Sequence, residues 1–78
     1  MKTRKEIEIE TLEGLREKLI AEAIENGIFL STLRRARLIS GKEDNLELVG
    51  QIRNREANEL QFESDIKLVE DKLKEKSK

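Results

Sequence analysis

The side chains that could carry out chemistry in this sequence are carboxylates, cations and hydroxyls. The 78 residues include no histidine, cysteine, tyrosine or tryptophan. This composition removes the usual general base and the strongest nucleophile, as well as the imidazole and thiolate ligands that zinc and other transition metals require. We therefore expect a non-enzymatic protein with no catalytic residue, no metal site and no cofactor.

Three glutamates near the N-terminus, Glu6, Glu8 and Glu10, are the best candidates for binding a hard cation. They alternate with Ile7 and Ile9, and alternate residues of a strand stand about 7 Å apart on one face. This spacing is too wide for one tight oxygen-ligand site. The alternation therefore predicts an acidic face rather than a metal centre.

A cluster of cations, Arg34, Arg35 and Arg37 with Lys42, is the best candidate for binding an anion. If a helix starts at Ser31, Arg34 and Arg35 lie in its first turn, where the helix dipole disfavours positive charge. An anionic partner with phosphate or carboxylate groups would offset that cost. The alternative is a solvated face whose long side chains reach into water.

The elements that would position these groups begin with a short strand. The period of two from Glu6 to Glu10 predicts a strand with both isoleucines on one face. The alternative is that these residues extend the following helix backwards. A strand must pair, and no second strand is visible, so we expect it to pair with the same strand of a second copy.

Two short helices and one long helix are expected next. Thr11 is the expected N-cap of a helix over 12–26, and Asn26-Gly27 its stop. A second helix is expected from Ser31 to about Ser40. The apolar positions that we expect to face inward on these two helices are Leu12, Leu15, Leu19, Ile20, Ala23 and Ile24 on the first and Leu30, Leu33, Ala36 and Ile39 on the second.

A long amphipathic helix over about 45–74 is the clearest periodic segment of the chain. Asp44 and Glu47 resemble a capping box at its start. Its seam has the alternating four-three spacing of a coiled coil, with a polar middle that would fix register or mark a hinge. The seam residues are Leu48, Ile52, Arg55, Glu59, Phe62, Ile66, Val69 and Leu73.

Length and composition suggest one small, mainly α protein that gains stability by oligomerising. Hydrophobic residues make up 36% of the chain and aromatic residues 3%, which gives a lone monomer a marginal core. We expect two units: 1–42 for dimerisation and binding, and 43–78 for packing against an oligomer or a partner. No cysteine, signal peptide or membrane span is apparent, so we expect a soluble, cytoplasmic protein.

The segment 5–39 resembles the ribbon–helix–helix family of dimeric repressors and antitoxins. The resemblance rests on the alternating Ile7 and Ile9, the helical Leu15, Leu19 and Ala23, the turn at 25–27 and the segment 31–36. It implies a homodimer in which two strands form an antiparallel ribbon that enters a DNA major groove. The implied dimer interface is Ile7, Ile9, Leu15, Leu19 and Leu33.

The same resemblance implies a DNA-binding transcription regulator. Its phosphate contacts would come from Arg34, Arg35, Arg37 and Lys42, with Lys2, Arg4 and Lys5 as an auxiliary arm. Two departures are evident: the loop after Gly27 is one residue short, which puts Arg34 where an apolar residue is expected, and the three ribbon glutamates would repel DNA. The overall balance of 16 basic against 17 acidic residues is also not that of a general polyanion binder. Antitoxins add a C-terminal segment that wraps a partner, a role that would fall to Leu48, Ile52, Phe62, Ile66, Val69 and Leu73.

Other interpretations remain beside this one. Ala23, Gly27, Leu33 and Ala36 also have helix-turn-helix spacing. The segment 12–27 resembles the first helix of small phosphatases that act on sporulation response regulators, whose S-x-x-x-D signature would be Ser40 and Asp44. The main alternative is a helical protein–protein interaction module (an adaptor, inhibitor or scaffold) that does not bind DNA.

Overall fold

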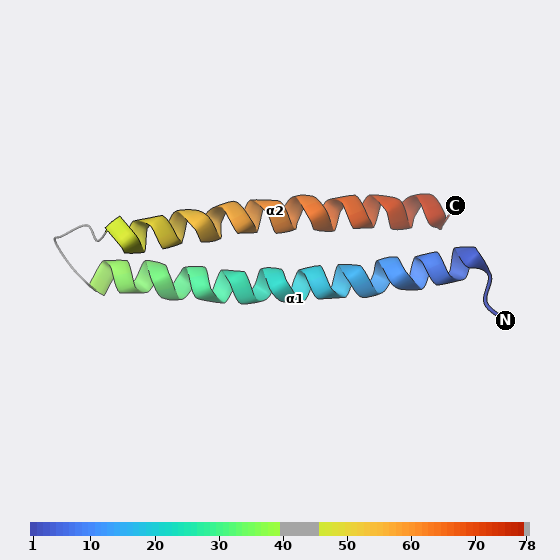
Figure 1. The fold of residues 1–78 in the computed structure, drawn as a ribbon, viewed down its shortest axis with the longest axis horizontal. Coiled ribbons are helices and arrows are strands. Elements are labelled where there is room, and N and C mark those ends of the chain that lie inside the picture. The colour runs from blue at the N-terminus through green and yellow to red at the C-terminus, as the bar shows by residue number, and fades with distance from the viewer. Residues whose placement is uncertain (40–45, 78) are drawn as a thin grey trace.

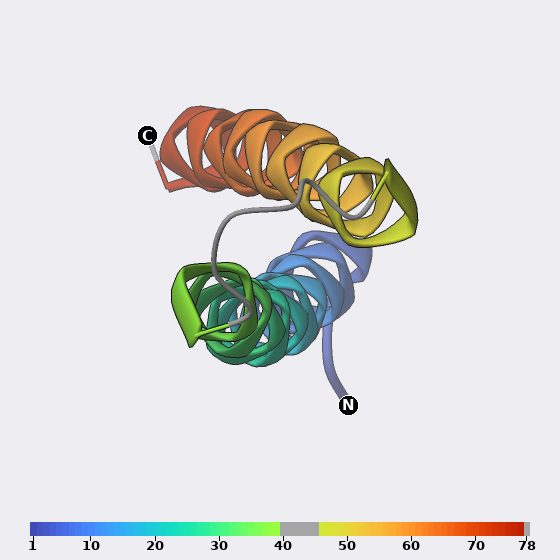
Figure 2. The same ribbon diagram turned by 90° about the vertical axis from the view of Figure 1, so that its left-hand side faces the viewer.

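Two long helices form an antiparallel hairpin in the computed structural model, which describes residues 1–39 and 46–77. Helix α1 spans Arg4–Ile39 and helix α2 spans Leu46–Lys76. Figure 1 shows them side by side along their whole length, with both chain termini at the same end. Seen from the end in Figure 2, α1 and α2 lie against each other, and no other element of the described residues packs on them. The Cα atoms extend over 62 × 17 × 15 Å.

Helix α1 begins seven residues before the expected N-cap at Thr11, so the expected strand over 6–10 is wrong. Thr3 caps the helix: its Oγ1 accepts a hydrogen bond from the Glu6 amide at 3.2 Å and lies 3.3 Å from the Glu6 carboxylate. Thr3 therefore acts as the N-cap and satisfies one of the exposed amides of the first turn. Arg4 and Glu8 add an ion pair one turn apart, and Thr11 donates to the Ile7 carbonyl inside the helix.

Helix α1 also continues through Asn26-Gly27, so the expected division into two short helices is wrong. Gly27 is helical, and a Cβ at that position would meet nothing within 4 Å. A glycine inside a helix costs about 1 kcal/mol relative to alanine. Packing on both sides of Gly27 offsets this cost, because Asn26 and Leu30 are among the most buried residues of the chain.

These two corrections overturn the ribbon–helix–helix fold. No strand occurs in the part of the chain that the structure describes, whereas that family requires one to build its ribbon. The helix-turn-helix alternative is wrong for a related reason, since Ala23, Gly27, Leu33 and Ala36 all lie in one continuous helix. The expected boundary between units 1–42 and 43–78 lies outside the described residues.

The long C-terminal helix occurs close to its expected range, and its seam faces α1. All eight seam residues of α2, from Leu48 to Leu73, are buried or half-buried. The matching seam of α1 has the same spacing, which lets two helices keep contact over many turns by a slight left-handed supercoil. The α1 seam residues are Ile9, Leu12, Arg16, Leu19, Ala23, Asn26, Leu30 and Leu33.

The resulting core is thin. Among the described residues, only Leu30, Ile52 and Val69 are buried apolar side chains, and Asn26 is the only buried polar one. A pair of helices can shield only one stripe of each helix, so the remaining apolar side chains stay half-covered or exposed. The hairpin therefore relies on a seam rather than on a closed hydrophobic core.

Candidate interaction surfaces

A polar layer crosses the seam near its middle and joins α1 to α2. The Nδ2 atom of Asn26 donates to the Arg55 main-chain carbonyl at 2.9 Å, and the Arg55 guanidinium donates back to Asn26 Oδ1 at 3.3 Å. The same guanidinium carbon lies 4.7 Å from the centre of the Phe29 ring, within the range of a cation–π contact. Asn26 is only 2% exposed, so these bonds replace water for its amide.

This layer determines how the two helices align. A buried amide that loses its partner costs about 1–3 kcal/mol, so a shift of α2 along α1 by one turn is disfavoured. A single buried asparagine is the best-attested device for fixing the register of a coiled coil. The spacing of α2 predicts the seam position of Arg55, whereas Asn26-Gly27 is typical of a helix stop, so the sequence pattern does not predict the contact between Asn26 and Arg55.

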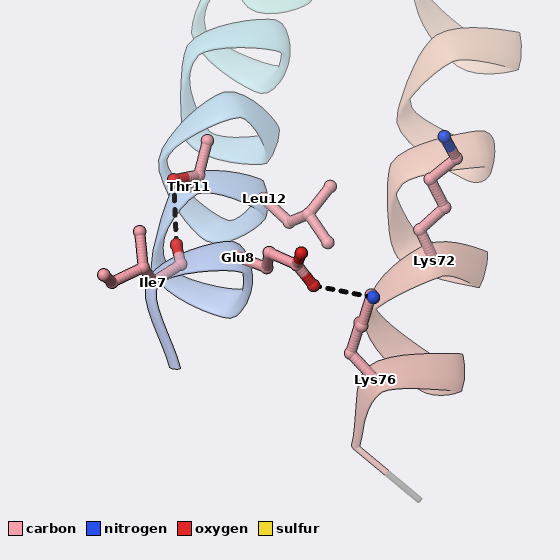
Figure 3. Close-up of a pocket in the computed structure, with 6 residues that line it drawn as sticks. All are labelled: Ile7, Glu8, Thr11, Leu12, Lys72 and Lys76. Atoms are coloured by element: carbon pink, nitrogen blue, oxygen red, sulfur yellow. Dashed lines mark hydrogen bonds and ion pairs between the residues drawn. The ribbon is translucent and has the colours of Figure 1, made fainter. Parts of the chain in front are cut away.

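A second contact between the helices lies at the open end of the hairpin. Lys76 Nζ is 2.6 Å from a Glu8 carboxylate oxygen, and Arg4 lies 3.2 Å from the other oxygen of Glu8. Figure 3 shows Glu8 and Lys76 facing each other across a shallow groove, which Ile7, Thr11, Leu12 and Lys72 also line. The contact joins the first turns of α1 to the last turns of α2.

The same pair changes the acidity of Glu8. The hydrogen bond from Lys76 and its positive charge lower the pKa of the Glu8 carboxyl below its ordinary value of 4.5; burial raises the pKa against this effect, and Arg4 lowers it further. The carboxylate is therefore the favoured form in the folded hairpin. Its partners are cations of the same chain, so this glutamate serves the fold rather than a metal.

An apolar stripe lies on α1 away from the seam. Ile20, Ile24 and Ile28 are four residues apart and so follow one face of the helix. They are 38%, 60% and 63% exposed. We call these three residues the outer stripe. The prediction that Ile20 and Ile24 face inward is therefore wrong, and Ile28 is not among the predicted inward positions. The spacing of four residues over 20–28 is the sequence signal that groups these three isoleucines on one face of the helix.

Arg16 marks a weak point of the seam. It occupies a position where an apolar residue would pack, and its Nε atom is buried without a hydrogen-bond partner. Glu70, Leu73, Lys74 and Ser77 line a shallow depression beside it. An unpaired polar atom of this kind lowers stability, which makes contacts elsewhere more important.

The residues predicted to contact DNA do not come together. Arg34, Arg35 and Arg37 lie in the last turns of α1, while Arg4 and Lys5 lie in its first turns. A helix rises 1.5 Å per residue, so these two groups are about 45 Å apart. Arg34 lies 3.9 Å from Glu56 of α2 and Arg4 is paired with Glu8. Lys42 lies outside the described residues. Without a ribbon, the DNA-binding regulator predicted from the sequence is wrong.

The residues predicted for the ribbon–helix–helix dimer are distributed over both sides of α1. Ile9, Leu19 and Leu33 are half-buried in the seam against α2. Ile7 and Leu15 are 52% and 44% exposed. The predicted partner surface of α2 (Leu48, Ile52, Phe62, Ile66, Val69 and Leu73) is directed toward α1 of the same chain.

Neither a metal centre nor a membrane span is found in the described parts of the chain. No group of three or more acidic side chains gathers there as metal ligands. Within the same residues, neither helix contains a segment apolar enough to cross a bilayer. Ser40 and Asp44, which carried the resemblance to phosphatases, lie outside the described residues.

No protein-family model, curated protein or solved structure matches this chain.

Proposed function

We propose that this protein is a non-enzymatic helical interaction module that binds a helical protein surface through the outer stripe of α1. The observation that supports this most directly is the exposure of Ile24 and Ile28, each at least 60% accessible on a continuous apolar face. Burying a large aliphatic side chain contributes about 1.5–3 kcal/mol. A three-isoleucine stripe is thus a suitable binding surface for another amphipathic helix.

The accessible area of the whole chain supports the same proposal. The hairpin exposes 6530 Å², whereas a compact monomer of its mass of 9.1 kDa would expose about 4,900 Å². The difference, about 1,600 Å², exceeds the roughly 800 Å² that each partner loses in a standard interface. The elongated hairpin therefore exposes more surface than a compact chain of its mass, by an area larger than one side of a standard interface.

The composition supports a binding role rather than catalysis. The chain has no histidine or cysteine, and the grooves between the helices are open and shallow, as Figure 3 illustrates. Such a surface can hold a partner but does not exclude water around a reacting group. Adaptors, inhibitors and scaffolds require only the first property.

Site-specific photocrosslinking in the cells that make the protein tests this proposal. A photoreactive residue in place of Ile24 or Ile28 should yield one discrete crosslinked protein product. The same residue in place of Lys18, an exposed position on another face of α1, is the matched control and should not. Crosslinking that is absent at all three positions, or equal at all three, would contradict the proposed binding surface.

A further inference from the structure

We infer that the partner of the outer stripe is a second copy of this chain, packed with its α1 antiparallel to the first α1 about a two-fold axis at Ile24. This inference rests on the proposed function and specifies the partner. In such an arrangement, residues whose numbers add to 48 face each other across the axis. Ile24 then meets Ile24 of the second copy, and Ile20 meets Ile28.

The stripe is self-complementary in the sense that a two-fold interface requires. Ile20 and Ile28 are four residues before and after Ile24, so reversing the helix direction maps the stripe onto itself. Each copy places the same three side chains against those of the other, so every isoleucine of the outer stripe has an isoleucine as its counterpart. A heterologous partner would need no such symmetry.

Charged residues beyond the two ends of the outer stripe also favour the antiparallel direction of pairing. Glu13 and Arg35 lie eleven residues before and after Ile24, and eleven residues are close to three full turns, so both lie on the face of the stripe. Both are exposed, and neither has an ion pair within the described residues. An antiparallel copy places Glu13 beside Arg35 twice. A parallel copy places each beside its own kind, which is repulsive.

Residues seven positions from Ile24 also fit the antiparallel arrangement. Seven residues are close to two turns, so Glu17 and Ser31 continue the same face, and both are exposed. The antiparallel pairing puts the Glu17 carboxylate beside the Ser31 hydroxyl, which can donate a hydrogen bond to it. In a parallel pairing, Glu17 would instead face Glu17. The polar residues beyond each end of the outer stripe therefore specify the direction in which the two helices pair, while the three isoleucines provide the buried apolar area.

The first test measures the mass in solution by sedimentation equilibrium. The wild-type chain should have twice its 9.1 kDa mass, and Ile24→Asp should be monomeric with unchanged helical content by circular dichroism. Leu68→Asp is the matched control, since Leu68 is an exposed leucine of α2, at 57% accessibility; this variant should remain dimeric. A monomeric wild type throughout the micromolar range would overturn the inference, as would an Ile24→Asp variant that stays dimeric.

Disulfide trapping then tests the axis, and the absence of native cysteine makes it unambiguous. Ile24→Cys should form a disulfide with itself, because the two residues meet at the axis. Ile20→Cys should not, because its copies would be about 12 Å apart along the helices, beyond disulfide reach. Mixing Ile20→Cys with Ile28→Cys should give the mixed disulfide. Efficient self-linkage at 20, 24 and 28 would instead indicate a parallel dimer and overturn the inference.

Charge exchange provides an independent test of direction. Glu13→Arg alone and Arg35→Glu alone should each raise the dimer dissociation constant several-fold, and the double variant should recover most of the loss. If the double variant dimerises no more tightly than the weaker of the two single variants, the antiparallel pairing is overturned. This inference and the proposed function can fail separately. A monomeric wild type that still crosslinks from position 24 to another protein would overturn the second copy as the partner but leave the proposed binding surface in place.

Discussion

Asn26 is the residue on which the alignment of the hairpin depends most. It is the only buried polar side chain in the described part of the molecule, and its amide both donates to and accepts from Arg55. Polar residues in a coiled-coil seam reduce stability but exclude alternative registers. Asn26 thus combines a local cost with a gain in structural uniqueness.

Replacing Asn26 with alanine should destabilise the hairpin by about 1–3 kcal/mol, because Arg55 loses its side-chain partner inside the seam. The better helix propensity of alanine offsets a small part of this cost. Urea unfolding followed by circular dichroism at a fixed protein concentration measures the change. Asn54→Ala, at an exposed position of α2, is the control. A loss for Asn26→Ala as small as that of the control would show that the layer is not stabilising.

At the scale of the elements, the two helices are joined near their middle by the polar layer and at the open end by Glu8 and Lys76. The end contact matters because helix ends fray, and here the first turns of α1 and the last turns of α2 lie together. Thr3 caps α1 at the same end. Capping and the ion pair together explain why α1 begins at Arg4.

The end contact predicts a pH-dependent contribution to stability. Because the pKa of Glu8 is lower in the folded chain than its ordinary 4.5, its contribution is fully present above that value and is lost as the pH falls through the folded-state pKa. Wild type should therefore melt at a higher temperature than Glu8→Gln at pH 7, and the difference should disappear in acid. Thermal unfolding of both proteins from neutral to acidic pH checks this.

Glu25→Gln is the control for this comparison, because Glu25 is exposed and has no ion pair among the described residues. Its melting temperature should follow that of wild type throughout the pH range. A Glu8→Gln protein that matches wild type at pH 7 would mean that the ion pair contributes nothing measurable, as many exposed pairs do.

At the scale of the whole molecule, the hairpin is elongated and incompletely shielded. Its radius of gyration is 17.7 Å, compared with about 11.5 Å for a compact domain of this length. Two helices cannot enclose a core, and α1 has apolar residues on both its seam and its outer stripe. Pairing two hairpins would convert the outer stripe into a second seam.

This geometry predicts that stability depends on protein concentration. Association of folded hairpins stabilises the folded state by mass action, so the melting temperature should rise with wild-type concentration. Ile24→Asp should melt at a lower temperature that does not change with concentration. Thermal unfolding over a hundredfold dilution series measures both. A wild-type melting temperature that is constant over this range would contradict self-association.

The sequence by itself determined the mainly helical character and the seam of α2. Eight positions with uninterrupted four-three spacing leave α2 only one face that can be buried, and a helix near the expected range 45–74 follows from that pattern. The lack of histidine and cysteine likewise limits the chemistry without reference to any fold. These conclusions depend only on residue type and period.

Only the tertiary structure decided how α1 is built and which of its faces is covered. The segment 6–10 has strand-like alternation but follows a helix N-cap at Thr3, and packing against α2 favours the helix. Asn26-Gly27 resembles a stop, but the buried bonds of Asn26 to Arg55 hold the helix intact. Of the two apolar stripes of α1, the structure places the one with Arg16 and Asn26 against α2 and leaves Ile20, Ile24 and Ile28 outside. Periodicity alone cannot rank two stripes on one helix, because each satisfies the same spacing and only the partner helix distinguishes them.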